Sequence, residues 1–140
     1  MIVNYHGLVE LANSAFSSLS NMPGVYIVFW MKNSRCVEIP RMLRIDRKGV
    51  LYIGSSKKLK NRLRNLWISL QMARSRAKRK KYPHTFGPSL IYTGLIDRIL
   101  DEELMICFKH FKNENYAKDQ EKLALLKYTR YYGCLLYTSP

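Results

Sequence analysis

The chain has 140 residues, in which 24 Lys and Arg oppose 10 Asp and Glu, giving a formal net charge of +14. This length supports one domain with one core and excludes two. The charge excess favours a polyanionic partner, with nucleic acid ahead of an acidic membrane surface. The longest uncharged apolar run, residues 25–31, is far shorter than the ~20 residues that span a bilayer, and the N-terminus, which carries Glu10, does not resemble a signal peptide. We therefore expect an intracellular protein, cytoplasmic or associated with the nucleoid, without a membrane partner.

The N-terminal part of the chain predicts a helix followed by a strand. Apolar residues at helical spacing indicate an amphipathic packing helix over residues 7–19, within an N-terminal segment of residues 1–22. After a turn, residues 25–30 are β-branched and aromatic, which is typical of a strand. Alternation along that strand places Tyr26, Val28 and Trp30 on one face.

A second strand is predicted at residues 50–54, antiparallel to the first. The connection between the two, residues 31–49, has Pro40 in its middle and turn-forming residues at both ends. It is typical of a long, partly ordered excursion with extended stretches at 36–39 and 42–45.

A leucine-rich helix follows the second strand directly. Its apolar stripe recurs at steps of four and three residues: Leu59, Leu63, Leu66, Leu70 and Ala73. At roughly 100° per residue, Arg62 lies beside this stripe, whereas Lys57, Asn61, Arg64 and Ile68 lie on the far side. Arg62 is therefore the basic residue expected to lean over the sheet, where its guanidinium suits a phosphate.

The next segment, residues 74–81, is basic at six of its eight positions and contains no aromatic residue. One interpretation is a solvated, flexible loop. The other is a loop that contacts phosphates without sequence preference. The candidate residues are Arg74, Arg76, Lys78, Arg79, Lys80 and Lys81.

The C-terminal half predicts two helices and a third strand. Ser89 is a plausible N-cap for a helix through Leu100, and residues 104–111 read as a strand. Asn115 can cap a last helix that ends near Tyr132, with Gly133 as its C-terminal cap.

Glu121 falls within the apolar arc of this last helix instead of on its wet face. The arc also contains Ala117, Ala124, Leu125, Tyr128, Tyr131 and Tyr132, while Asp119, Lys122 and Arg130 face away. An unpaired carboxylate there would be costly, so a cation, strong donors or a raised pKa is expected. A divalent metal and a rim salt bridge with a nearby Lys or Arg explain the pattern equally well.

Taken together, several motifs resemble the GIY-YIG nuclease superfamily. They are GVY at residues 24–26, YIG at 52–54, the arginine eight residues after that glycine, and the glutamate on the last helix. The resemblance covers residues 23–133, which it implies form a nuclease domain. It implies an α+β fold in which a small three-stranded antiparallel sheet is flanked by helices, with the site on the sheet face.

Residue roles follow from the resemblance. It implies that Tyr26, Tyr52, Arg62, His84 and Glu121 are catalytic, with Glu121 as the ligand of one Mg²⁺ or Mn²⁺ ion. It also implies that Gly54 lets substrate approach, with Ser55, Lys57 and Lys58 beside it. In such a site the ion polarises a phosphate, Arg62 neutralises developing charge, and a tyrosine whose pKa is lowered by cations accepts a proton from water.

The chain departs from the family pattern at four places. Leu66 replaces the His or Tyr found one turn after the arginine, and Ser55 stands where some members have lysine. The separation from Tyr26 to Tyr52, 26 residues, implies an insertion. The chain ends in GCLLYTSP without the family's Pro and Asn segment, so residues 134–140 are interpreted as a truncated or non-native tail.

The leading functional hypothesis is a metal-dependent DNA endonuclease that hydrolyses phosphodiester bonds in duplex or branched DNA. Two alternatives remain open. The domain could be a catalytically degenerate module that binds DNA or RNA, or the chain could be a small basic RNA-binding protein whose GVY and YIG are accidental strand sequence.

Overall fold

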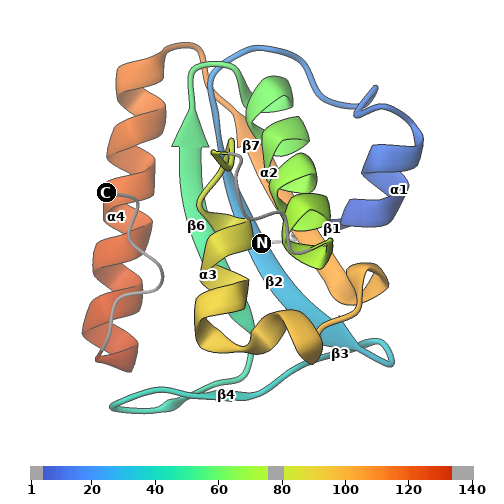
Figure 1. The fold of residues 1–140 in the computed structure, drawn as a ribbon. Coiled ribbons are helices and arrows are strands. Elements are labelled where there is room, and N and C mark those ends of the chain that lie inside the picture. Colours follow the sequence, from blue (N-terminus) through green and yellow to red (C-terminus); the bar gives the residue numbers. More distant parts are fainter. Residues whose placement is uncertain (1–4, 76–80, 134–140) are drawn as a thin grey trace.

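The computed structural model describes residues 5–75 and 81–133. An antiparallel sheet stands in the middle, with helices against both of its faces (Figure 1). The predicted α+β class is therefore confirmed. The predicted tail, residues 134–140, lies outside the described residues.

The sheet has five strands, so the prediction of three is wrong in number. The three predicted strands form its centre: β2 (Gly24–Lys32) lies between β7 (Leu104–His110) and β6 (Val50–Ser56). The additional strands are β1 (Tyr5–Gly7), which pairs with β7, and β3 (Arg35–Cys36), which pairs with the end of β2. Both were missed because strands of two or three residues are too short to show alternation.

The first helix is shorter than its apolar spacing predicts. α1 (Leu8–Asn13) ends where the Ser14 hydroxyl donates to the Leu11 carbonyl at 3.1 Å. Ala15 and Phe16 then take φ angles of +54° and +56°, which turn the chain back. Phe16 is still buried, as is Leu19. The apolar spacing thus predicted the burial of Leu8, Leu11, Phe16 and Leu19 correctly, but it was wrong for Ala15, which is exposed, and for the length of the helix.

The long connection between β2 and β6 contains a hairpin held in place by hydrogen bonds, whereas the sequence predicted a partly ordered excursion. β4 (Ile39–Pro40) pairs with β5 (Ile45–Asp46) in a separate two-stranded sheet. The fully buried Asp46 carboxylate accepts hydrogen bonds from the backbone N–H of Lys48 at 2.8 Å and of Val50 at 3.1 Å. It also accepts one from the Tyr128 hydroxyl at 2.6 Å, which ties the hairpin to the last helix.

α2 (Leu59–Arg74) buries its predicted stripe completely against the sheet. The next helix, α3 (Phe86–Thr93), begins three residues before Ser89, so the predicted N-cap is wrong. Gly94, at φ +77°, ends α3 and separates it from the 3₁₀ turns η1 (Leu95–Asp97) and η2 (Asp101–Glu103). A left-handed glycine ends a helix at little cost, which explains why the predicted helix does not continue to Leu100.

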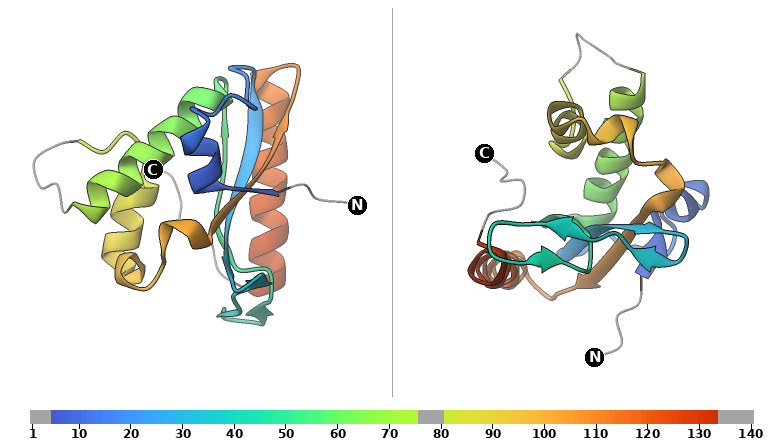
Figure 2. Two further views of the ribbon diagram at one scale, coloured as in Figure 1. Left: turned by 90° about the vertical axis from the view of Figure 1, so that its right-hand side faces the viewer. Right: turned by 90° about the horizontal axis from the view of Figure 1, so that it is seen from below.

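The last helix, α4 (Glu114–Tyr132), lies on the other face of the sheet from α1, α2 and α3 (Figure 2). Its N-cap is Asn113, which accepts from the backbone N–H of Tyr116 at 2.7 Å, and not Asn115. Gly133 takes the predicted left-handed conformation at its C-terminus, with φ +82°. Within the described part of the chain, no helix has the length and apolar character needed to cross a membrane.

Candidate active site

The two motif tyrosines lie side by side on the sheet face that α2 and α3 cover. Strand pairing sets Tyr26 opposite Gly54 and Val28 opposite Tyr52, and side chains of opposed residues share a face. The two phenol rings stack with centroids 5.9 Å apart and planes 15° apart. Tyr26 is 1% exposed and Tyr52 is 2% exposed. The structure thus brings both predicted tyrosines together, but inside the core and not on an open surface.

The side chains of Tyr26 and Tyr52 leave no room for a Cβ atom at Gly54. A Cβ atom at this position would lie 2.6 Å from the Tyr26 hydroxyl oxygen and 2.9 Å from Cε1 of Tyr52. The space that the sequence-based hypothesis assigned to an approaching substrate is thus occupied by the Tyr26 side chain.

His84 lies within hydrogen-bonding distance of Tyr26, and its tautomer follows from its second contact. The backbone N–H of Phe86 donates to Nδ1 at 2.9 Å, so this nitrogen carries no proton. The proton of the neutral ring is then on Nε2, which lies 2.6 Å from the Tyr26 hydroxyl oxygen and donates to it. The Ser69 hydroxyl fixes the segment by donating to the His84 carbonyl at 2.6 Å.

Burial shifts the pKa of both groups toward their neutral forms. It lowers the pKa of His84 from its usual 6.5 to about 3, and the Arg62 charge adds to this effect. Burial raises the pKa of Tyr26, and so does Tyr52, while the charge and a hydrogen bond of Arg62 act against them. The expectation that cations lower the pKa of a motif tyrosine is therefore wrong for Tyr26, because burial dominates.

Arg62 leans over the sheet as the helical wheel predicted. Its side chain is half-buried, and Nη1 donates to the Pro83 carbonyl at 3.4 Å. Arg64, two residues later, is exposed. The structure therefore distinguishes the two arginines in the predicted way and places Arg62 beside Tyr26 and His84.

Glu121 lies on the opposite face of the sheet from the tyrosines, where α4 packs. Ser55 pairs with Val25 and so points to the α4 face, where its hydroxyl donates to Oε1 of Glu121. The Glu121 side chain is half-buried, and its charge is the smallest of the effects that raise the pKa of Tyr26. The candidate site therefore spans both sides of β6.

A divalent ion is compatible with this donor set in one binding mode. Across residues 5–75 and 81–133, no three His, Cys, Asp or Glu side chains gather as a ready-made metal cage. Mg²⁺ is, however, commonly held by one or two carboxylates together with waters and substrate phosphates. A carboxylate such as Glu121, oriented by the Ser55 hydroxyl and partly open to solvent, fits that mode.

The predicted phosphate-binding residues divide into three groups. Lys57, Lys58 and Lys81 are exposed and remain candidates. The structure gives Arg74 a different role, because its guanidinium bonds Asp101 at 2.9 Å and the carbonyls of Ile96 and Ile99, which joins α2 to the 3₁₀ turns. The others, Arg76, Lys78, Arg79 and Lys80, lie outside the described residues.

Sequence reasoning missed two hydroxyl residues near the tyrosines. Thr85 lies 3.4 Å from the Tyr52 hydroxyl, oxygen to oxygen. Ser69 accepts the backbone N–H of Gly87 at 2.9 Å and thereby aligns α3 with α2. Thr85 belongs to no periodic pattern or motif, whereas Ser69, three residues after Leu66 and four before Ala73, lies on the buried stripe of α2. The role of Ser69 depends on the close approach of the two helices, where a Cβ on Gly87 would lie 2.3 Å from the Ser69 carbonyl oxygen.

Comparison with known proteins adds no relative. No protein-family model matches the chain, and neither a curated protein nor a solved structure matches it.

Proposed function

We propose that this protein is a metal-dependent endonuclease of the GIY-YIG type that hydrolyses phosphodiester bonds in DNA. The observation that supports it most is the convergence on the Tyr26 hydroxyl: His84 and Arg62 both bond it, and the Glu121 charge reaches it. These groups come from β2, α2, α4 and the segment before α3. Two of them, Tyr26 and His84, have displaced pKa values, and such groups beside a guanidinium are typical of catalytic sites.

These residues differ in solvent exposure, and their proposed roles differ accordingly. Arg62, Ser55 and Glu121 are half-buried and can contact a bound phosphate. Glu121 would hold the divalent ion, which when bound supplies electrostatic stabilisation to the reacting phosphate. Arg62 would donate to the phosphoryl oxygens as their charge increases. Tyr52 and His84, each 2% exposed, act as positioning residues in this proposal.

The bonding of Tyr26 supports a role as donor and not as base. Its oxygen accepts from His84 Nε2–H and interacts with Arg62, so its own proton remains available for one further hydrogen bond. Because burial raises its pKa, that proton is retained at neutral pH. Proton removal from the attacking water would then fall to a group other than Tyr26.

A second candidate function, a catalytically degenerate domain that binds DNA or RNA, is favoured by a specific observation. Tyr26, Tyr52 and His84 are nearly inaccessible, and Leu66, at the position where family members carry His or Tyr, is fully buried in the core. In this proposal the tyrosine cluster only stabilises the fold, and the exposed lysines bind the phosphates.

The experiment that separates the two is cleavage of supercoiled plasmid with and without Mg²⁺ or Mn²⁺. We expect metal-dependent nicking by the wild-type protein and a loss of about 10²-fold or more in Glu121→Gln, because a neutral amide is a poor ligand for a hard cation. Glu114→Gln is the matched control, since Glu114 lies in the first turn of the same helix and pairs with the exposed Lys118, 3.2 Å away. Binding without cleavage in all variants would support the degenerate domain, and equal cutting by Glu121→Gln would remove Glu121 from the site.

A further inference from the structure

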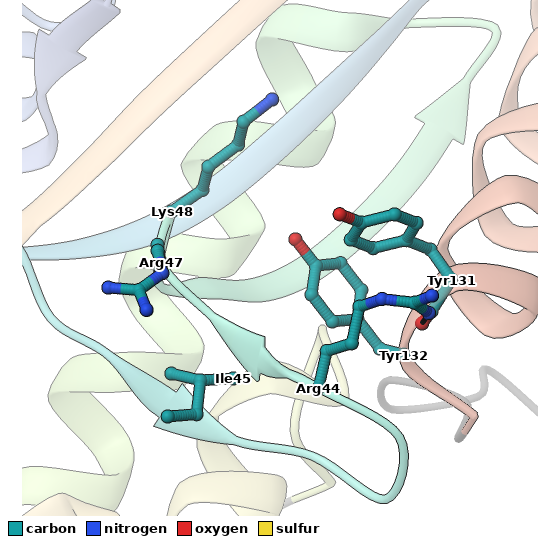
Figure 3. A pocket seen from close by; sticks show the side chains of 6 residues that line it. All are labelled: Arg44, Ile45, Arg47, Lys48, Tyr131 and Tyr132. Atoms are coloured by element: carbon teal, nitrogen blue, oxygen red, sulfur yellow. Dashed lines mark hydrogen bonds between the residues drawn. The ribbon is translucent and has the colours of Figure 1, made fainter.

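A pocket of about 470 Å³ lies where the β4–β5 hairpin meets the C-terminal end of α4 (Figure 3). Its lining combines three basic residues from the hairpin with two aromatic residues from the helix: Arg44, Arg47, Lys48, Tyr131 and Tyr132, together with Ile45. None of these residues belongs to the candidate active site. The hairpin that supplies the basic side is the insertion between the two tyrosine motifs.

Hydrogen bonds and ring contacts hold the lining residues of the pocket in place. Arg44 Nη1 donates to the Tyr131 carbonyl at 2.6 Å, and the Arg44 guanidinium lies 4.3 Å from the centroid of the Tyr131 ring. The Tyr131 and Tyr132 rings meet edge to face with centroids 4.8 Å apart. The backbone N–H of Leu43 donates to the Tyr132 carbonyl at 2.9 Å. Hairpin and helix are therefore joined by several bonds at the pocket itself.

The lining suits one class of ligand, a nucleotide whose base is unpaired. Tyr131 is 55% exposed, so its ring offers a surface on which a base can stack. Arg44 and Lys48 provide cations for a phosphate, and Arg47 adds a third that is partly neutralised by Glu38 at 2.7 Å in an exposed ion pair. A base in a perfect duplex keeps its faces stacked and cannot use the tyrosine.

The position of the pocket connects it with the candidate active site. Tyr131 follows Glu121 by ten residues on the same helix, which corresponds to about 15 Å along the axis. That length is close to the rise of roughly four stacked nucleotides of one strand. A strand whose phosphate lies at Glu121 could therefore place a nearby nucleotide in the pocket.

We propose that this pocket binds an unpaired nucleotide a few positions from the reacting phosphate, so that the protein prefers branched or tailed DNA over perfect duplex. Its role in directing cleavage rests on the proposed nuclease function, whereas binding at the pocket does not.

The test measures binding by fluorescence anisotropy in EDTA, which prevents cleavage, for a blunt duplex and for the same duplex with an unpaired oligo(dT) tail. The wild-type protein should bind the tailed probe about tenfold more tightly, as expected for stacking of a base on an aromatic ring. Tyr131→Ala should remove most of this preference, and Tyr131→Trp should restore it.

Tyr116→Ala is the matched control, because Tyr116 is 51% exposed at the opposite end of α4. A thermal melt of each variant checks that it folds. Equal losses in the two alanine variants, an unchanged preference in Tyr131→Ala, or displacement of the tail by an acidic peptide of equal charge would each overturn the proposal. Because no cleavage is involved, a protein that fails to cut plasmid but shows the Tyr131-dependent preference refutes the nuclease function and retains the pocket.

Discussion

The two faces of the sheet are stabilised in different ways, although the candidate site uses both. The face under α1, α2 and α3 carries one continuous apolar core that includes Leu8, Leu63, Tyr26 and Phe86, all nearly inaccessible. On the α4 face only Ile53 and Tyr128, among the described residues, are buried in a common cluster. The apolar residues that pack around this pair are only partly buried, so α4 also depends on other attachments.

Polar bonds provide those attachments. Tyr128 donates to the buried Asp46 and accepts from Nε of Arg41 at 2.8 Å, and Arg41 also bonds the carbonyl of Val50 at 2.9 Å. Burial and the Asp46 hydrogen bond raise the pKa of Tyr128, so it remains a neutral donor. The tyrosine half of the site is therefore held by close packing, and the Glu121 half by a helix that hydrogen bonds fix in place.

The largest expected effect compares the two faces directly. Leu63→Ala, in the core under α2, should lower the free energy of unfolding by about 2–5 kcal/mol, because a fully buried leucine leaves a cavity. Leu125→Ala, on the half-buried side of α4, should cost only about 1–2 kcal/mol. Urea denaturation of both variants measures the difference, and equal losses would show that the α4 face is packed as closely as the other.

A pair of arginine variants tests whether an arginine on α2 must lean over the sheet to contribute to cleavage. Arg62→Lys keeps the charge but loses the planar fork of donors, so cleavage should fall by about 10- to 100-fold. Arg64→Lys, at an exposed position of the same helix, should change the rate by less than about twofold. Both rates come from the plasmid assay at saturating metal. Similar rates for the two variants would contradict the assignment of Arg62 to the phosphate.

Lowering the pH should reduce the free energy of unfolding, because His84 is buried in its neutral form. Its pKa is about 3 when folded and near 6.5 when unfolded, so the unfolded chain binds an extra proton between these values. Stability is therefore complete above about pH 6.5 and falls toward pH 3, by about 1.4 kcal/mol per pH unit from this group.

Urea denaturation from pH 7 to pH 4 measures that slope. The same series on His84→Asn, which lacks the titrating ring, should show a shallower dependence on pH. Parallel curves for the two proteins would mean that His84 does not couple protonation to folding.

The smallest expected effect, on the salt dependence of DNA affinity, distinguishes basic residues that bind phosphates from basic residues that stabilise the fold. Lys57→Gln should reduce the slope of log affinity against log salt by about one, because an exposed lysine that contacts a phosphate releases one counterion. Arg74→Gln should leave the slope unchanged and lower stability, because Arg74 bonds Asp101 and two carbonyls. The reverse pattern would return Arg74 to the phosphate-binding set.

The sequence was sufficient for features that depend on local periodicity. The strand over residues 25–30, the buried stripe of α2 and the orientation of Arg62 follow from steps of two or of three and four residues, and all three are confirmed. The apolar arc of α4 is confirmed at Ala117 and Tyr128, whereas Tyr131 is exposed. The prediction of burial fails at Tyr131, where α4 contacts the β4–β5 hairpin.

Only the tertiary structure decided the properties that depend on residues far apart in the chain. Gly54 is needed because Tyr26, on the neighbouring strand, fills its side-chain space. The His84 tautomer depends on a backbone N–H and on a tyrosine from β2, and the rise in the pKa of Tyr26 depends on how deeply helices and sheet bury it. The sequence determined which residue types could meet, because side-chain direction within one helix or strand is local. Packing of elements against one another determined which of them are desolvated, and desolvation controls both their protonation and their access to a substrate.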